Sequence, residues 1–267
     1  MRLLVAGDAR VDAGKTTFST GLCASLDAPG FKPRAANDYW FDHDDYRRSV
    51  HDGRLYGKDA RRLAAAGPGD RTPEDCNPVH RLWRPSPGPD TGLVGATHRQ
   101  FVLDRVGDAF VVNGDADVPA DAREFLPLDD ATTVTSLDAL NAAMERLHVD
   151  ALDGVRGTIR DADRAVVESY GDIALPVRDL AFDAVAIVDP GRVRVYDGDR
   201  YARACEAVSG TPREGRLEER VGDVLAYCDP LATVSLPALA SDVWTDPDAV
   251  ADAYEVAYEA VVTAALS

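Results

Sequence analysis

The stretch Leu3-Leu-Val-Ala-Gly7-Asp-Ala9-Arg-Val-Asp-Ala-Gly14-Lys15-Thr16-Thr17 opens the chain and decides its fold. It starts as a short apolar run typical of a buried parallel strand, turns at glycine, and continues into a helical pattern up to about residue 26. Residues 9–16 fit the pattern A/G-x-x-x-x-G-K-S/T. In that pattern the backbone N–H groups of the loop and the N-terminus of the helix surround phosphate oxygens. The sequence therefore predicts a loop for a nucleoside triphosphate.

Two side chains of this loop have separate expected tasks. Lys15 reaches the β- and γ-phosphate oxygens, and the hydroxyl of Thr16 ligates Mg²⁺. The other positions expected to contact the nucleotide are Ala9, Asp12, Ala13, Gly14 and Thr17. The guanine-specifying motif N-K-x-D does not occur in the sequence. We therefore expect ATP and Mg²⁺ as cofactors.

A site of this kind also needs an acid on a neighbouring strand to hold Mg²⁺ or its water shell. Glu168 ends the apolar run Ala165-Val-Val-Glu168, and Asp189 ends the run Ala186-Ile-Val-Asp189. The carboxyl ends of parallel strands face the ligand crevice in such sheets. Glu168 is the first choice and Asp189 the second, whereas a strand-end acid that only meets solvent is the structural alternative.

Five segments in order resemble the dethiobiotin synthetase branch of P-loop proteins, which reads roughly D-x-x-V-G-K-T, G-Y-K-P, S-D-A-x-x-L, N-P and V-E-G-A-G-G. The matching stretches are Asp12-Ala-Gly-Lys15-Thr16-Thr17, Gly30-Phe-Lys32-Pro33, Lys58-Asp59-Ala-Arg-Arg-Leu63, Asn77-Pro78 with Arg84-Pro-Ser-Pro87, and Val166-Val-Glu168. The agreement covers residues 1–90 and 164–172. Each segment is weak by itself, and their order makes the resemblance more specific.

The resemblance implies roles for five side chains. Thr16, Asp59 and Glu168 would be the Mg²⁺ ligands, and Lys15 would hold the γ-phosphate. Lys32 would sit across the sheet edge, where it pairs with an anionic substrate or with the transferred phosphoryl group. In that family ATP phosphorylates a carboxylate or carbamate, and a nearby nitrogen attacks the acyl phosphate. A second ammonium opposite Lys15 would also stabilise charge on the transferred oxygens.

Near the C-terminus, Pro237 and Leu239 resemble a family segment I-P-x-L that lies beside the nucleotide base. At the substrate end the resemblance has limits. After Glu168, Ser169 and Tyr170 replace glycines that leave room for substrate in the family. The phosphate machinery is expected to carry over, and the substrate is expected to be a small anion of unknown identity.

The composition is strongly acidic. The 267 residues carry a net charge of −17, with three lysines among 29 basic residues and 36 aspartates among 46 acids. This resembles proteins of salt-accumulating halophilic archaea, because such a surface stays hydrated and self-repelling when salt screens charge. The charge also disfavours nucleic acid as the main partner. Because lysine is scarce, each lysine is a candidate for a place where a compact ammonium is needed.

The alternation of apolar strands and helical stretches predicts a three-layer α/β/α P-loop NTPase fold with a mostly parallel central sheet. We expect one domain over 1–267, with a loop and β-hairpin insertion at about 67–128, in which 67–95 is loop and 101–105 and 109–113 form the hairpin. A second short strand is expected over 31–36 and a helix over about 216–228. No apolar run is long enough to span a membrane. The N-terminus shows no export signal, and the four cysteines are scattered, so we expect a cytoplasmic protein.

Three functions compete at this stage. The first is an ATP-dependent kinase or ligase of the dethiobiotin synthetase-like group. The second is a polynucleotide 5′-kinase, whose loop D-S-G-K-S/T-T also resembles residues 12–17; an exposed Trp40 beside a strip of arginines would favour it. The third is a nucleotide switch or assembly ATPase, for which a nucleotide-dependent homodimer would be the sign.

Overall fold

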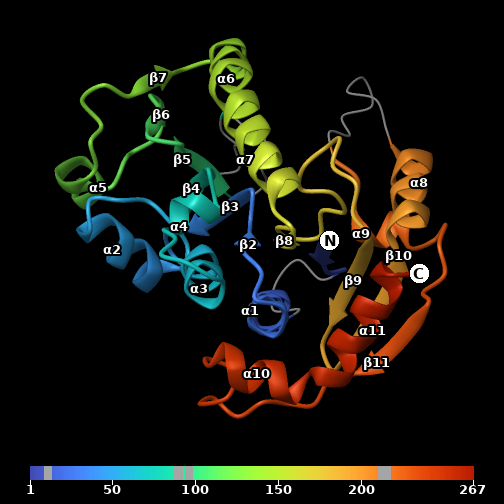
Figure 1. Cartoon of the computed structure of the whole chain (residues 1–267). Coiled ribbons are helices and arrows are strands. Elements are labelled where there is room, and N and C mark those ends of the chain that lie inside the picture. The colour runs from blue at the N-terminus through green and yellow to red at the C-terminus, as the bar shows by residue number, and fades with distance from the viewer. Residues whose placement is uncertain (9–13, 87–92, 94–98, 210–217) are drawn as a thin grey trace. The chain divides into compact units, whose positions relative to one another are not determined.

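A computed structural model describes residues 1–8, 14–86, 93, 99–209 and 218–267 of the chain (Figure 1). The described residues are mixed α/β and fall into two compact units. The first unit consists of 1–33, 62–72 and 156–267, and the second of 34–61 and 73–155. The chain thus passes between the units four times, including once directly after Pro33.

The first unit is built on a six-stranded sheet in the order β11-β10-β9-β1-β8-β2. Its strands are β1 (Arg2–Ala6), β2 (Gly30–Phe31), β8 (Ala165–Glu168), β9 (Ala184–Asp189), β10 (Arg192–Asp197) and β11 (Ala232–Ser235). β1 lies between β8 and β9 and is parallel to both, and β2 is parallel to β8. β10 is antiparallel to its two neighbours. These pairings confirm the predicted mostly parallel sheet for this unit. Continuous apolar runs such as Leu3–Ala6 predicted it, because strands of such a sheet are buried on both faces.

Helices accompany this sheet. They are α1 (Lys15–Leu26), α8 (Gly198–Val208), α9 (Val221–Val224), α10 (Pro247–Ala253) and α11 (Glu255–Ala265). α1 contacts β8 and α10, while α8 and α11 contact β9 and β10. A Cβ at Gly21 of α1 would lie 2.4 Å from the Tyr258 hydroxyl, so the helices approach too closely there for a larger residue. The helix expected over 216–228 is much shorter than predicted in its described part: α9 covers four residues, and Arg220 before it pairs with Ile173 instead.

The second unit has its own five-stranded sheet in the order β3-β4-β5-β6-β7. The strands are β3 (Arg34–Asp38), β4 (Val79–Pro85), β5 (Arg99–Val106), β6 (Ala109–Asn113) and β7 (Thr132–Val134). β5 and β6 form the antiparallel hairpin predicted from the sequence, with Val106 opposite Ala109. The two outer pairs, β3 with β4 and β6 with β7, are parallel.

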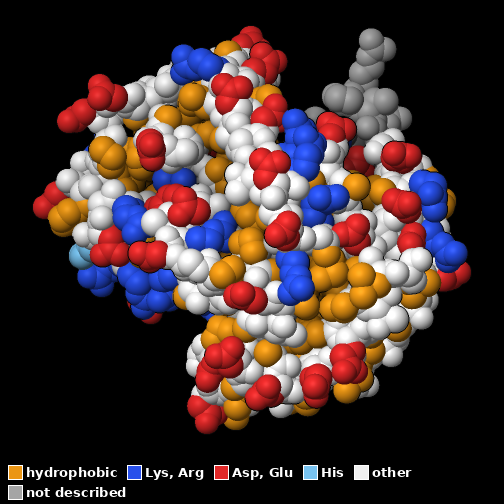
Figure 2. Space-filling model, in the orientation of Figure 1, with side chains coloured by type: hydrophobic (Ala, Val, Ile, Leu, Met, Phe, Trp, Pro, Cys, Tyr) orange, Lys and Arg blue, Asp and Glu red, His pale blue; other side chains and the backbone are white. Residues whose placement is uncertain are grey.

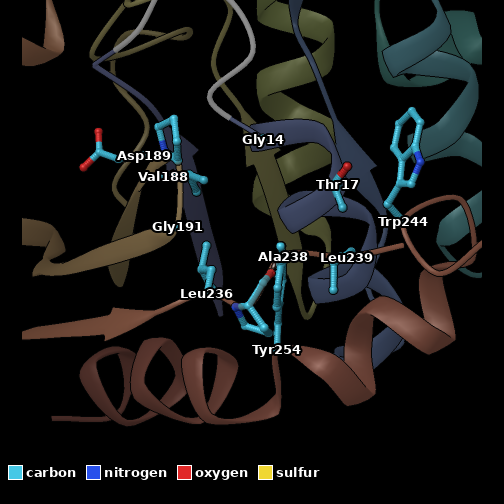
Figure 3. Close-up of a pocket in the computed structure, with 12 residues that line it drawn as sticks. Gly14, Thr17, Val188, Asp189, Gly191, Leu236, Ala238, Leu239, Trp244 and Tyr254 are labelled. Atoms are coloured by element: carbon cyan, nitrogen blue, oxygen red, sulfur yellow. Dashed lines mark hydrogen bonds between the residues drawn. The ribbon is translucent and has the colours of Figure 1, made fainter. Parts of the chain in front are cut away.

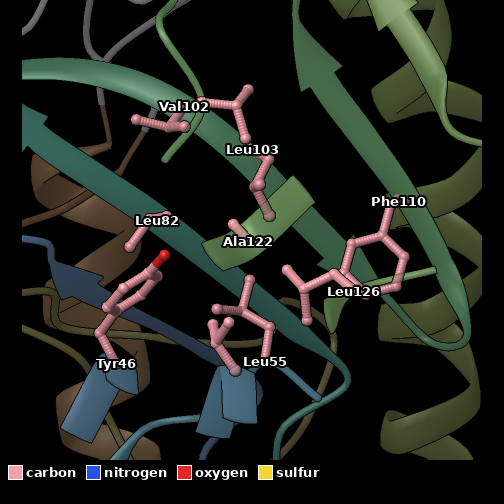
Figure 4. Packing of buried hydrophobic residues seen from close by; sticks show 10 residues of the cluster. Tyr46, Leu55, Leu82, Val102, Leu103, Phe110, Ala122 and Leu126 are labelled. Carbon is pink, nitrogen blue, oxygen red and sulfur yellow. The ribbon is translucent and has the colours of Figure 1, made fainter. Parts of the chain in front are cut away.

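Short helices accompany this sheet: α2 (His43–His51), α4 (Pro73–Cys76), α5 (Ala120–Phe125), α6 (Leu137–Ala143) and a π-helix η1 (Met144–His148). Figure 4 shows the apolar cluster between α2, α5 and the strands, in which Tyr46, Leu55 and Leu103 are fully buried. Two further helices, α3 (Lys58–Ala66) and α7 (Val149–Asp161), contain the points where the chain crosses between the units.

The second unit has bounds other than those of the insertion expected at about 67–128, and the single domain stays a prediction. The second sheet already begins at Arg34, and the region 67–95, expected as loop, contains α4 and β4. The strand expected over 31–36 is split at Lys32-Pro33 into β2 of one sheet and β3 of the other. Proline cannot donate a ladder hydrogen bond, so it ends the first strand there.

Acidic side chains are spread over the face of the molecule shown in Figure 2, with arginines and lysines between them. Among the described residues, no helix is long and apolar enough to cross a lipid bilayer.

Candidate functional site

The start of α1 lies where the sequence places the phosphate loop. β1 ends at Ala6, and α1 begins at Lys15 after Gly14, whose φ of 83° is left-handed and therefore favours glycine. Ala9, Asp12 and Ala13, three of the expected nucleotide contacts, lie outside the described residues. Gly14, Lys15, Thr16 and Thr17 occupy the N-terminal end of α1. This end carries the partial positive charge of the helix dipole.

Glu168 is the centre of a small polar cluster at this helix end. It is the last residue of β8, and its side chain is fully buried. Its Oε1 accepts a hydrogen bond from Thr16 Oγ1 at 2.9 Å and another from Lys32 Nζ at 2.7 Å. Its Oε2 is buried and has no hydrogen-bond partner in the described part of the chain. The sequence separates these three residues by up to 152 positions, and the parallel sheet brings them together.

Both lysines expected to act on phosphate are buried. Lys15 is 8% exposed, and its Nζ donates to the Gly171 carbonyl at 2.7 Å. Lys32 is 6% exposed and follows β2, which pairs with β8, so its side chain reaches the end of β8. Pro33 biases Lys32 towards extended backbone, which helps to fix where the side chain projects.

The second-choice acid has a different environment. Asp189 ends β9, but its Oδ2 is held by Arg192 at 3.1 Å and by Arg194 at 2.9 Å. It therefore forms an ion-pair cluster at the end of β9 with two arginines of β10. Of the two strand-end acids, Glu168 is the one bonded to the Thr16 hydroxyl.

Asp59, the third metal ligand implied by the resemblance, lies in the first turn of α3 and is half-buried. It belongs to the second unit, whereas Thr16 and Glu168 belong to the first. Its role in metal binding stays a prediction. The described residues contain no group of three or more His, Cys, Asp or Glu side chains that could hold a metal ion.

A pocket of about 270 Å³ adjoins the same end of α1 (Figure 3). Gly14 and Thr17 line its polar end, and Pro237 and Leu239, expected beside the nucleotide base, also line it. The remaining wall comes from the end of β9 and the turn after it, the 236–239 segment, and the residues that flank α10: Val188, Asp189, Pro190, Gly191, Leu236, Ala238, Trp244 and Tyr254. One end therefore presents the helix terminus, and the remaining wall carries apolar side chains together with the charged Asp189.

Arg62 is a residue of this region that the sequence did not single out. Its guanidinium donates to the Trp244 carbonyl at 2.7 Å, lies 5.1 Å from the Trp244 ring centroid, and is 3.4 Å from Thr17 Oγ1. It links the 240–246 segment to the first turn of α1. Its position within the Lys58–Leu63 segment was the only signal, and that segment pointed to Asp59 instead.

The loop after Glu168 is closed by a segment far along the chain. The Ser169 hydroxyl donates to the Ile173 carbonyl at 2.6 Å, and the Tyr170 hydroxyl bonds Glu218. Val221 N donates to the Asp172 carbonyl at 2.8 Å. Tyr170 therefore bonds the 218–221 segment, whereas Ser169 bonds within its own loop.

The chain matches no protein-family description, and no curated protein matches it. The site must therefore be interpreted from its own residues.

Proposed function

We propose that this chain is a Mg²⁺-dependent, ATP-binding enzyme of the P-loop class, similar to dethiobiotin synthetase, with the three-layer α/β/α arrangement of that class around the first unit's sheet. It transfers the γ-phosphoryl group to a small anionic substrate or uses that transfer for ligation. The convergence of Thr16 and Lys32 on the buried Glu168 carries the proposal. A glycine turn before a helix is common in proteins, whereas this convergence adds the acid and the second ammonium that phosphoryl transfer needs.

The cluster suits Mg²⁺. Because the Thr16 hydroxyl donates a hydrogen bond to Glu168, the lone pairs of its oxygen stay available for a cation. The unpartnered Oε2 of Glu168 is an acceptor whose burial is otherwise costly. Mg²⁺ prefers oxygen ligands and keeps waters and substrate phosphates around it, so one carboxylate and one hydroxyl are a sufficient protein share. Thr16 and Glu168 would hold the ion, with Asp59 as the proposed third ligand.

The two lysines supply the fixed positive charge. When nucleotide is present, Lys15 exchanges the Gly171 carbonyl for phosphate oxygens, and Lys32 stabilises the charge of the transferred group. Phosphoryl transfer depends almost entirely on positioning and electrostatic stabilisation, and groups held in a buried site act more strongly than groups in water.

The pocket at the helix end supports a nucleotide as the ligand. Its polar end at Gly14 and Thr17 suits phosphates, and its apolar part at Leu236, Pro237 and Tyr254 suits the flat face of a base. Its volume of about 270 Å³ is near the lower end of ligand pockets, about 300 Å³.

The test is ATP binding and phosphate release by the full chain at high KCl, with and without Mg²⁺, followed by a screen of small carboxylates for phosphorylation. Lys15→Ala is expected to abolish hydrolysis and to leave the circular dichroism spectrum unchanged. Lys58→Ala is the matched control, because Lys58 is an exposed lysine on α3. Wild-type hydrolysis in a folded Lys15→Ala protein would refute the proposal.

A polynucleotide 5′-kinase is the second candidate, and one observation favours it. Trp40 and Phe41 are 72% and 82% exposed. Their backbone N–H groups both donate to Asp38 Oδ1, at 2.8 and 3.2 Å, so the turn that presents these rings is ordered. Exposed aromatic faces are what unpaired bases stack on. Transfer of phosphate to RNA 5′-hydroxyl ends that falls in Trp40→Ala would favour this candidate over the first.

A further inference from the structure

The protein itself supplies a cation at Glu168. The Lys32 ammonium lies 2.7 Å from Glu168 Oε1, and the side chains of the pair are 8% and 0% exposed. The same oxygen accepts the Thr16 hydroxyl. The carboxylate oxygen that faces Thr16 is therefore occupied twice, and its negative charge is balanced by a protein group.

The other carboxylate oxygen does not offer an easy alternative. Glu168 Oε2 is buried and is not reached by solvent, so an ion arriving alone would have to shed its waters and rearrange the cluster to reach it. Mg²⁺ dehydrates reluctantly. A dication entering beside the Lys32 ammonium would also meet a like charge in a poorly screened interior, where repulsion is strong. Both effects act against free metal.

We propose that Lys32 takes the place of the divalent cation at Glu168 while the site is free of nucleotide, so that the protein selects the metal–nucleotide complex and rejects free Mg²⁺. The polyphosphate of that complex brings enough negative charge to attract the ammonium away from Glu168. Lys32 would then pair with the phosphates, and Glu168 and Thr16 would be left to hold the metal ion. The inference rests on the proposed function, because it concerns the same cluster.

The test measures metal binding without nucleotide. Mn²⁺, used as the probe for Mg²⁺, is titrated into the nucleotide-free full chain at high KCl, and free Mn²⁺ is followed by electron paramagnetic resonance. Glu168→Gln gives the background of weak binding to the acidic surface. Wild type is expected to match this background. Lys32→Met is expected to gain a Glu168-dependent site about tenfold or more above background, because one unit of like charge has been removed.

Two variants complete the experiment. Lys32→Arg keeps the charge and is expected to bind no Mn²⁺ above background, and Lys32→Met with Glu168→Gln is expected to lose the gained site. A Glu168-dependent Mn²⁺ site in nucleotide-free wild type would overturn the inference, and so would a folded Lys32→Met protein without one. If Lys32→Met does not fold, the comparison of wild type with Glu168→Gln decides. Failure of the proposed function is seen separately, as the absence of ATP binding by wild type.

Discussion

Each unit of the molecule buries one carboxylate against a cation, and the two pairs are completed differently. In the first unit, Oε1 of Glu168 accepts from both Thr16 and Lys32, and its Oε2 has no hydrogen-bond partner among the residues that the structure describes. In the second unit, Asp104 of β5 is equally buried, but Arg81 of β4 donates to both of its oxygens at 2.6 Å. His148 Nε2, at the end of the π-helix, lies 3.4 Å from Asp104 Oδ2.

The difference fits a structural role for the Arg81–Asp104 pair and the functional role proposed for the Lys32–Glu168 pair. A buried charge is tolerated when its partner and hydrogen bonds are in place, and at Asp104 both carboxylate oxygens are hydrogen-bonded by Arg81. An acceptor left unfilled in the interior costs stability, so its retention at Glu168 suggests a ligand that fills it. The surroundings agree. Arg81 also lies 4.7 Å from the Phe101 ring centroid and 5.3 Å from that of Trp83, inside a packed layer, whereas Glu168 adjoins the open end of a helix.

The largest expected effect on stability comes from breaking the Arg81–Asp104 pair. Arg81→Met leaves Asp104 buried without its partner, and should lower the free energy of unfolding by about 3–5 kcal/mol. Denaturant unfolding and amide hydrogen exchange in β4 and β5 measure this. Arg84→Met is the control on the same strand, because Arg84 pairs with the 85% exposed Asp117 and should cost under about 1 kcal/mol. Similar costs for both variants would contradict the structural interpretation of the Arg81–Asp104 pair.

Breaking the Lys32–Glu168 pair should lower the turnover number of the enzyme. Lys32→Ala is expected to reduce kcat about a hundred- to a thousandfold, roughly 3–4 kcal/mol, because a charged contact made in the transition state is lost. ATP affinity should change little. Lys32→Arg should restore activity only in part, since a planar guanidinium does not replace a compact ammonium. A loss confined to ATP binding, or equal turnover, would remove Lys32 from catalysis.

Acid should weaken the Arg81–Asp104 pair. Burial by itself raises the pKa of Asp104, but Arg81 and His148 outweigh it, and the pKa lies below its ordinary value. A carboxyl of this kind stabilises the fold fully above its unfolded pKa of about 3.9, and loses that contribution as the pH falls through the lower folded pKa. The stability cost of Asp104→Asn should therefore be largest near neutral pH and shrink below about pH 4. A cost independent of pH between about 7 and 2 would contradict this.

The smallest expected effect is that of deleting both charges at the site. Lys32→Met combined with Glu168→Gln removes the ammonium and the carboxylate together, so no buried charge is left alone. The free energy of unfolding should change by about 1 kcal/mol or less, while hydrolysis is lost. Denaturant unfolding of the double variant beside each single variant checks this. A large loss in the double variant would mean that the pair holds the fold.

Local patterns predicted much of the first unit. The apolar runs of β1, β8 and β9 and the glycine turn before α1 are visible in the sequence, and parallel strands bring their carboxyl ends to one edge. Glu168 could therefore be expected near Thr16. The position of Asp59 relative to them depends on how the units are arranged, which local patterns do not encode.

The second unit was harder to predict because its order comes from pairing between distant residues. Asp104 lies in the apolar strand Phe101–Val106 and is one of 36 aspartates, so nothing in its neighbourhood marks it as buried. It becomes significant only when the register of β4 and β5 places it opposite Arg81. The split at Lys32-Pro33 was also missed, because a single proline can end a strand or sit at its edge.

The scarcity of lysine has a practical consequence. Of the three lysines, Lys15 and Lys32 are buried at the site, whereas the Lys58 side chain is 57% exposed. Amine-acylating reagents leave arginine unmodified, so in the resting protein they should react at Lys58 and at the N-terminal amine. Any acylation of Lys15 or Lys32 then measures how often the cluster opens. Mass spectrometry of the acylated protein can therefore follow the opening of the cluster without an added label.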